Sequence, residues 1–205
     1  MDLFLSFAIQ LFIIVDPIAG IPVFLAITPR NSRQERLAMA RRGCLVAFLL
    51  VVFFLLGGPG LLAYLGISTS AVRIAGGLLL FAIALEMLYG RPTGTGTTRR
   101  EERLAQAKAD ISITPLAIPL LAGPGAIVNS LIFSGQASGF GDYLALLGAA
   151  ATVFAATYLL LGRATLLAGA LGRLGTTIVI RVMGLVLAFL AVQYVIDGVR
   201  ALLEG

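Results

Sequence analysis

The sequence contains no histidine, no tryptophan and a single cysteine, Cys44, among 205 residues. Histidine is the usual general base near neutral pH and a common zinc ligand, so the usual base and the usual zinc ligand are both missing. One cysteine excludes an internal disulfide and a cysteine metal cluster. We therefore expect neither an enzyme nor a protein with a resident metal or cofactor.

Charged residues are also scarce. Only 12% of the chain is charged, whereas 59% is hydrophobic and the mean hydropathy is +1.01. A soluble domain carries about a quarter charged residues, so these charges are too few to cover the apolar mass. The composition predicts an all-α integral membrane protein with lipid as its surroundings. The formal net charge of +5 is explained by the positive-inside rule, and we expect no nucleic-acid partner.

A membrane-spanning helix needs roughly 20 apolar residues, so the length allows six spans and leaves no room for a separate soluble domain. The predicted spans cover about 3–28, 43–65, 70–89, 112–135, 142–162 and 178–199. The first has no basic n-region or small-residue cleavage site, so it reads as a retained span rather than a signal peptide. Residues 1–90 and 111–205 then form two halves, joined by a polar linker at 91–110.

The basic residues predict the orientation in the membrane. Thirteen of the fifteen fall in the connections after the first, third and fifth spans: Arg30, Arg33, Arg36, Arg41, Arg42, Arg91, Arg99, Arg100, Arg103, Lys108, Arg163, Arg173 and Arg181. Only Arg73 and Arg200 fall on the other side. Because arginine and lysine are enriched in cytoplasmic loops, these three connections are expected in the cytoplasm and both termini outside.

The two halves resemble each other. Residues 73–81 match residues 181–189 without a gap at an offset of 108, and Pro17 falls on Pro124 at an offset of 107. Each half has three predicted helices, an odd number, so the second half must be inserted upside down relative to the first. Two inverted three-helix repeats are a common basis of alternating access in transporters.

Proline and glycine interrupt the first and fourth spans. The first interruption predicts a short non-helical stretch at Asp16–Ile21, and the second predicts a break at Gly123-Pro124-Gly125. Inside a bilayer a helix is broken only where protein or a wet cavity satisfies the freed backbone groups. Paired breaks in two halves indicate a substrate site. The simpler interpretation is that each kink serves helix packing.

The chemistry of the breaks favours a zwitterionic cargo. Free N–H groups of Gly125, Ala126 and Ile127 at a half-helix start suit a carboxylate, and Asp16 with freed carbonyls suits an ammonium group. The predicted substrate-binding residues are Asp16, Pro17, Gly20, Pro22, Gly123, Pro124, Gly125 and Ala126. Gln10 and Asn129 are expected to support them by hydrogen bonds. Alternatively, Asp16 is a protonated helix cap, and the two amides only join helices.

Four ordered motifs, spread over essentially the whole chain, resemble the MarC family. They are Asp16-Pro-Ile-Ala-Gly-Ile-Pro-Val-Phe, Val72-Arg-Ile-Ala-Gly-Gly, Pro115-Leu-Ala-Ile-Pro with Ala122-Gly-Pro-Gly, and Arg181-Val-Met-Gly. The family is grouped with the LysE-type exporters. The resemblance implies a six-helix protein of the bacterial or archaeal inner membrane. For some members it implies transport of small neutral amino acids such as alanine and glycine.

Three functions remain open at this point. The first is a carrier of small neutral amino acids, coupled to a proton or sodium gradient. The second is an exporter of drugs or other small metabolites, and the third is a non-transporting membrane protein. A cavity of amino-acid size at the breaks would favour the first, a wide aromatic cavity the second, and dry, tightly packed breaks the third.

Overall fold

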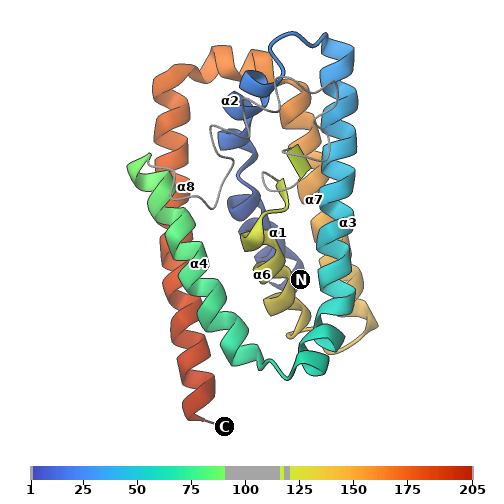
Figure 1. The fold of residues 1–205 in the computed structure, drawn as a ribbon, viewed down its shortest axis with the longest axis vertical. Coiled ribbons are helices and arrows are strands. Elements are labelled where there is room, and N and C mark those ends of the chain that lie inside the picture. The colour runs from blue at the N-terminus through green and yellow to red at the C-terminus, as the bar shows by residue number, and fades with distance from the viewer. Residues whose placement is uncertain (1, 91–115, 118–120, 205) are drawn as a thin grey trace.

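The computed structural model describes residues 2–90, 116–117 and 121–204, and every regular element in that part of the chain is a helix (Figure 1). The predicted linker at 91–110 and most of residues 112–120 lie outside the described residues. The elements are α1 (Asp2–Val15), α2 (Pro17–Ile27), α3 (Arg33–Leu65), α4 (Thr69–Tyr89), α6 (Pro124–Ser134), α7 (Phe140–Gly162) and α8 (Ala164–Leu203).

The helices have the length and composition of membrane spans. Five stretches are long and apolar enough to cross a bilayer: Leu3–Ile27, Arg33–Leu65, Thr69–Tyr89, Phe140–Gly162 and Leu174–Leu203. Helix α6 is apolar but shorter. Large apolar side chains such as Leu49 and Phe53 on α3 are more than half exposed, as expected for side chains that face lipid. The prediction of an all-helical membrane protein is confirmed, with five long spans and the shorter α6.

Two helices begin earlier than predicted. Helix α3 starts at Arg33 rather than near residue 43, because Ser32 and Glu35 form a capping box. The Glu35 carboxylate accepts the Ser32 N–H at 2.7 Å, and the Ser32 hydroxyl accepts the Glu35 N–H at 3.3 Å. Helix α8 starts at Ala164 rather than near residue 178, and it bends at Gly172, whose φ of 62° is left-handed.

The connections between helices lie at two opposite ends of the molecule. Figure 1 shows the α2–α3 and α7–α8 connections together at the top, and the α3–α4 connection and the C-terminus at the bottom. The top therefore gathers several basic residues that the sequence assigns to one side: Arg30, Arg33, Arg36 and Arg163. We call this end of the molecule the basic end. That it faces the cytoplasm stays a prediction.

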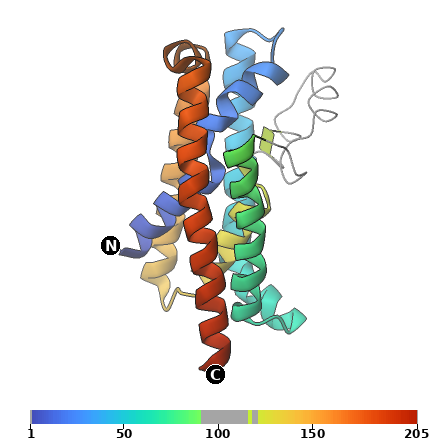
Figure 2. The same cartoon turned by 90° about the vertical axis from the view of Figure 1, so that its left-hand side faces the viewer.

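Helices α4 and α8 lie side by side in both views and run in opposite directions (Figures 1 and 2). A Cβ atom at Gly77 of α4 would lie 2.6 Å from the Ala191 carbonyl oxygen of α8. A Cβ atom at Gly184 of α8 would lie 3.2 Å from the Ala84 carbonyl oxygen of α4. Each helix thus offers a glycine that lets the other backbone approach closely. At the offset of 108 Gly184 aligns with Gly76, the neighbour of Gly77, and a Cβ atom at Gly76 would instead meet Val128 of α6. The inverted repeat stays a prediction.

The buried core lies between α1, α2, α3, α6 and α7. Phe7 of α1 and Phe133 of α6 pack with ring centroids 5.1 Å apart and ring planes tilted by 51°, and Leu116 and Leu121 join the same cluster. A second cluster joins α4 and α8 to Ile13 of α1 and Ile132 of α6. Helices α1 and α6 therefore stand at the centre of the bundle, where the predicted breaks fall.

Candidate functional site

The first interruption is a single residue. Asp16 lies between α1 and α2 with φ 39° and ψ 65°, and it is the one non-glycine residue with positive φ in the part of the chain that the structure describes. Its N–H donates to the Phe12 carbonyl at 3.0 Å, and its carbonyl accepts the Gly20 N–H at 3.1 Å. The predicted non-helical stretch at Asp16–Ile21 is therefore too long. Pro17 occupies the first helical position, where no N–H is needed, so the helix resumes at once.

The Asp16 side chain is buried, and only one of its two carboxylate oxygens accepts a hydrogen bond from a described residue. It is 8% exposed, and its Oδ1 accepts the Ala19 N–H at 3.2 Å as a helix cap. Its Oδ2 has no hydrogen-bond partner among the described residues. Pro17 has no N–H, so the Ile13 carbonyl loses its usual donor four residues later. The break thus offers two acceptors, the Asp16 Oδ2 and the Ile13 carbonyl that Pro17 leaves without this donor.

The second interruption precedes α6. Gly123 is extended, with φ −71° and ψ 176°, and α6 starts at Pro124 without a side-chain cap. The N–H groups of Ala126 and Ile127 both point to the Gly123 carbonyl, at 3.0 and 3.3 Å. Of the three N–H groups expected to be free, only that of Gly125 has no acceptor among the described residues. The donor set at this helix start is smaller than the sequence suggested.

The two interruptions are in contact. A Cβ atom at Gly125 would lie 3.0 Å from Ile14 Cγ2 and 2.9 Å from Leu80 Cδ2. Ile14 precedes Asp16 by two residues, so the end of α1 packs directly on the start of α6. Glycine at position 125 permits this approach, because any side chain would displace Ile14 or Leu80.

The other predicted residues separate into two groups. Pro17, Gly20 and Ala126 are buried with Asp16 and Gly125, and Gly123 is half-buried. Pro22 and Pro124 are exposed. Pro22 lies inside α2, where its ring faces away from the core. The two exposed prolines shape the backbone rather than line a buried site.

Gln10 and Asn129 meet a residue that the sequence did not single out. The Tyr194 hydroxyl of α8 lies within hydrogen-bond distance of the Gln10 side-chain oxygen on α1 and 2.7 Å from Asn129 Oδ1 on α6. A tyrosine hydroxyl carries one proton, so it donates to one amide oxygen and accepts from the NH2 group of the other amide. In either arrangement one polar atom of the Asn129 amide has no partner in the described structure.

Tyr194 is 7% exposed and Asn129 is fully buried. The sequence signal for Tyr194 was a hydroxyl within an apolar span, which is weak because tyrosine is common at membrane interfaces. These three side chains come from α1, α6 and α8, so they tie α1 and α6 to the last helix. We call them the Tyr194 cluster.

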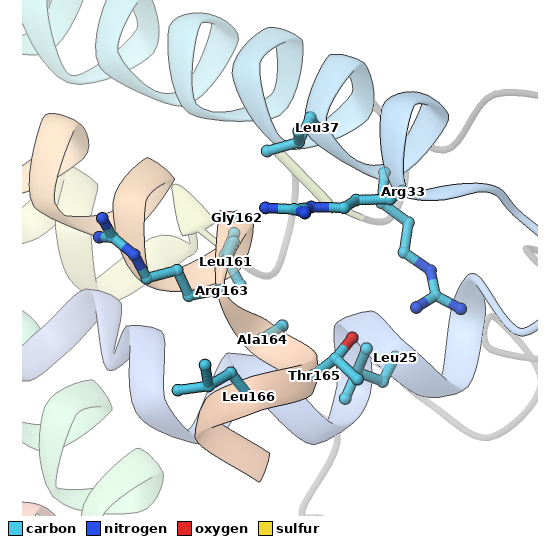
Figure 3. Close-up of a pocket in the computed structure, with 10 residues that line it drawn as sticks. Leu25, Arg33, Leu37, Leu161, Gly162, Arg163, Ala164, Thr165 and Leu166 are labelled. Carbon is cyan, nitrogen blue, oxygen red and sulfur yellow. The ribbon is translucent and has the colours of Figure 1, made fainter. Parts of the chain in front are cut away.

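Three cavities of the described structure lie away from the breaks. The largest has a volume of about 560 Å³ and lies at the basic end, between the start of α3 and the α7–α8 junction (Figure 3). A second, of about 250 Å³, lies between α3 and α7 beside Cys44, and a third, of about 30 Å³, lies beside Arg73. None of these three is lined by Asp16 or Gly125. In the described part of the chain, no three acidic or cysteine side chains group as metal ligands would.

Comparison with known proteins decides the family. Residues 1–203 match the model of the MarC family integral membrane proteins. The chain belongs to the MarC family. This confirms the resemblance carried by the four sequence motifs, and no solved structure matches the chain.

MarC-family relatives occur in bacteria and archaea. The chain is 34% identical over 195 residues to the UPF0056 membrane protein YvbG of Bacillus subtilis, covering 95% of this chain and 92% of that one. It is 36% identical over 194 residues to MJ1677 of Methanocaldococcus jannaschii, covering 95% and 94%. It is 31% identical over 207 residues to the UPF0056 inner membrane protein YhgN of Escherichia coli, covering all of both chains. The similarity therefore spans both halves of the MarC fold.

Proposed function

We propose that this MarC-family protein is a secondary transporter of small neutral amino acids such as alanine and glycine, with no enzymatic activity. The substrate binds between the break at Asp16 and the start of α6. The observation that carries the proposal is the unpaired, buried Oδ2 of Asp16 at a helix interruption. The inner membrane is the proposed location, in keeping with the name of the Escherichia coli relative.

The ammonium group of the substrate meets Asp16. A carboxylate within the membrane costs at least ~2.5 kcal/mol on insertion scales and is a functional residue by default. The cap to Ala19 satisfies only Oδ1. An ammonium group carries three donors, enough for Asp16 Oδ2 and the freed Ile13 carbonyl. Its positive charge also offsets the cost of burying the carboxylate.

The carboxylate of the substrate meets α6. The Gly125 N–H is the free donor at the positive end of this helix. Asn129 follows Gly125 by four residues, so its side chain lies on the same face of α6. The unpaired atom of its amide is then the second donor, when Tyr194 holds the amide by its oxygen.

The packing around Gly125 supports a small substrate. Ile14, Leu80 and Ile83 all lie within 3.4 Å of the Cβ position of Gly125. A substrate with a large side chain would have to displace several of these residues at once. Hydrogen and methyl side chains, those of glycine and alanine, require the least displacement.

Alternating access would use the two halves of the chain as inverted repeats. The match of residues 73–81 with residues 181–189 supports this arrangement. Coupling to a proton or sodium gradient is part of the proposal, since a carboxylate such as Asp16 binds either ion.

The tight packing at Gly125 equally favours the rival, a membrane protein that does not transport. Flux of radiolabelled alanine into proteoliposomes separates the two, with and without imposed pH and sodium gradients. We expect saturable alanine flux in the wild type and none in empty liposomes. If protein-containing and empty liposomes take up alanine equally under every gradient, the transport proposal is wrong. Efflux of cationic dyes without alanine flux would instead favour a drug exporter.

A further inference from the structure

The cavity at the basic end is lined by both arginine and leucine side chains. Its walls come from the end of α2, the first turns of α3 and the α7–α8 junction. Three arginines line it, Arg33, Arg36 and Arg163, together with leucines such as Leu37 and Leu166. At about 560 Å³ it is within the range of small-molecule sites.

Among the described residues, only Arg36 of these three arginines has a hydrogen-bond partner for its side chain. Arg36 donates from Nε and Nη2 to the Thr28 carbonyl, at 3.1 and 2.7 Å, and so holds the end of α2. Arg33 and Arg163 make no side-chain hydrogen bond or ion pair to any described residue. Figure 3 shows Arg33 reaching from α3 across the cavity toward Gly162. In the described part of the chain, two guanidinium groups therefore line one cavity without a counter-charge.

The backbone adds to this positive character. Helix α8 begins at Ala164 with no side-chain cap, and Ala164, Thr165 and Leu166 all line the cavity. Free N–H groups in the first turn of a helix favour an anion. The charge and the helix start point to the same kind of ligand, one with phosphate oxygens, since arginine binds phosphate in a bidentate geometry.

The surroundings indicate that this phosphate belongs to a lipid. The cavity lies where α2 and α7 end, at the level expected for head groups. Leu166 on its rim is 69% exposed and Leu174, just after the bend at Gly172, is 75% exposed. Basic pockets between spanning helices bind anionic head groups. A free phosphate ion has no acyl chain, so exposed leucines beside the cavity would not contribute to its binding.

We propose that this cavity, which we call the Arg33–Arg163 pocket, binds the head group of an anionic phospholipid. Arg33 and Arg163 hold its phosphate, the first turn of α8 donates to it, and one acyl chain lies along Leu166. The site is separate from the proposed amino-acid site, and neither proposal depends on the other.

Native mass spectrometry of the full chain in detergent tests this, with phosphatidylglycerol, phosphatidylcholine or inorganic phosphate added separately. We expect retained phosphatidylglycerol and little phosphatidylcholine. Arg33→Gln and Arg163→Gln should each weaken phosphatidylglycerol binding about fivefold, and the double variant about twenty-fivefold, given the usual contribution of one basic side chain near a membrane. Arg30→Gln, which removes a charge from the same end outside the pocket, is the matched control.

Thr165→Asp tests the pocket without removing an arginine, because a carboxylate on its wall repels the lipid phosphate. Gel filtration and thermal unfolding report whether each variant is folded. Equal losses in Arg30→Gln and Arg33→Gln would show a diffuse charge effect and overturn the proposal. So would equal retention of both lipids. Binding of inorganic phosphate that displaces phosphatidylglycerol would assign the site to a soluble anion and overturn the lipid assignment.

Discussion

The Tyr194 hydroxyl lies 2.7 Å from Asn129 Oδ1, although the two residues are 65 positions apart. This contact joins α8 to α6, about one turn after the start of α6 at Pro124. The Tyr194 hydroxyl is therefore one of the groups that hold α6 in place, beside the apolar contacts of Phe133 and the hydrogen bond from Ser134 to the Leu55 carbonyl. The first prediction follows from this contact.

Tyr194→Phe should destabilise the protein by about 1–3 kcal/mol, because the Gln10 and Asn129 amides lose their partner in a buried site. Thermal unfolding in detergent measures the loss. Tyr64→Phe is the matched control, since Tyr64 is 88% exposed, and it should leave the transition unchanged. Equal unfolding transitions for Tyr194→Phe and the wild type would mean that the hydroxyl does not hold α6.

Variants at Asp16 should separate charge from backbone geometry. Asp16→Asn keeps a capping side chain and tolerates the left-handed conformation. Asp16→Gly tolerates it without a side chain, whereas Asp16→Ala loses the cap and is strained. We expect stability in the order Asn above Gly above Ala. Alanine flux should fall about tenfold or more in all three, since a hydrogen bond to a charged group contributes about 1.5–3 kcal/mol. If the alanine flux of the three variants instead falls in the same order as their stability, Asp16 acts only as a helix cap.

Gly125→Val should abolish alanine flux. The added side chain meets Ile14 and Leu80 within about 3 Å, and overpacking of this kind costs about 1–3 kcal/mol. Gly60→Val on α3 adds the same bulk where no described atom lies within 4 Å. That control should keep its flux. Normal flux in a folded Gly125→Val protein would remove α6 from the proposed site.

Gly77→Val should separate α4 from α8. The nearest atom to the new Cβ is the Ala191 carbonyl oxygen at 2.6 Å, which is backbone and cannot move cheaply. We expect a loss of about 3 kcal/mol, at the upper end of overpacking effects. Gly57→Val, at an open position on α3, is the control for bulk alone. Unfolding curves that coincide for the two variants would show that the α4–α8 contact is not close.

The orientation can be tested with reporter fusions at residue 205. The basic end should lie in the cytoplasm and the C-terminus outside, because thirteen of fifteen basic residues fall on one side. Alkaline phosphatase is active only outside the reducing cytoplasm. Fused to the C-terminus, it should therefore be active if the C-terminus lies outside. Activity of a cytoplasmic reporter at the same position would reverse the topology.

The sequence predicted the helices better than their ends and partners. Hydropathy located the apolar spans because burial in lipid depends on composition. It missed the first turns of α3, where capping by Ser32 and Glu35 extends the helix through polar residues. It overestimated the break after Asp16, because Pro17 at a helix start is favourable. Tyr194 could not be found, since its partners on α1 and α6 are set by tertiary packing alone.

Arg36 fixes the end of α2 to α3 through two hydrogen bonds to the Thr28 carbonyl, and the Thr28 hydroxyl donates to Phe24 one turn earlier. This clamp makes the six-residue stretch from Thr28 to Arg33 a rigid joint rather than a flexible hinge. If the protein rocks between two states as proposed, we expect α2 and α3 to move together when the contact between Ile14 and Gly125 opens. Asp16, whose left-handed backbone joins α1 to α2, is where we expect that movement to bend the chain. The residue proposed to bind the substrate would then also be the point about which the protein moves.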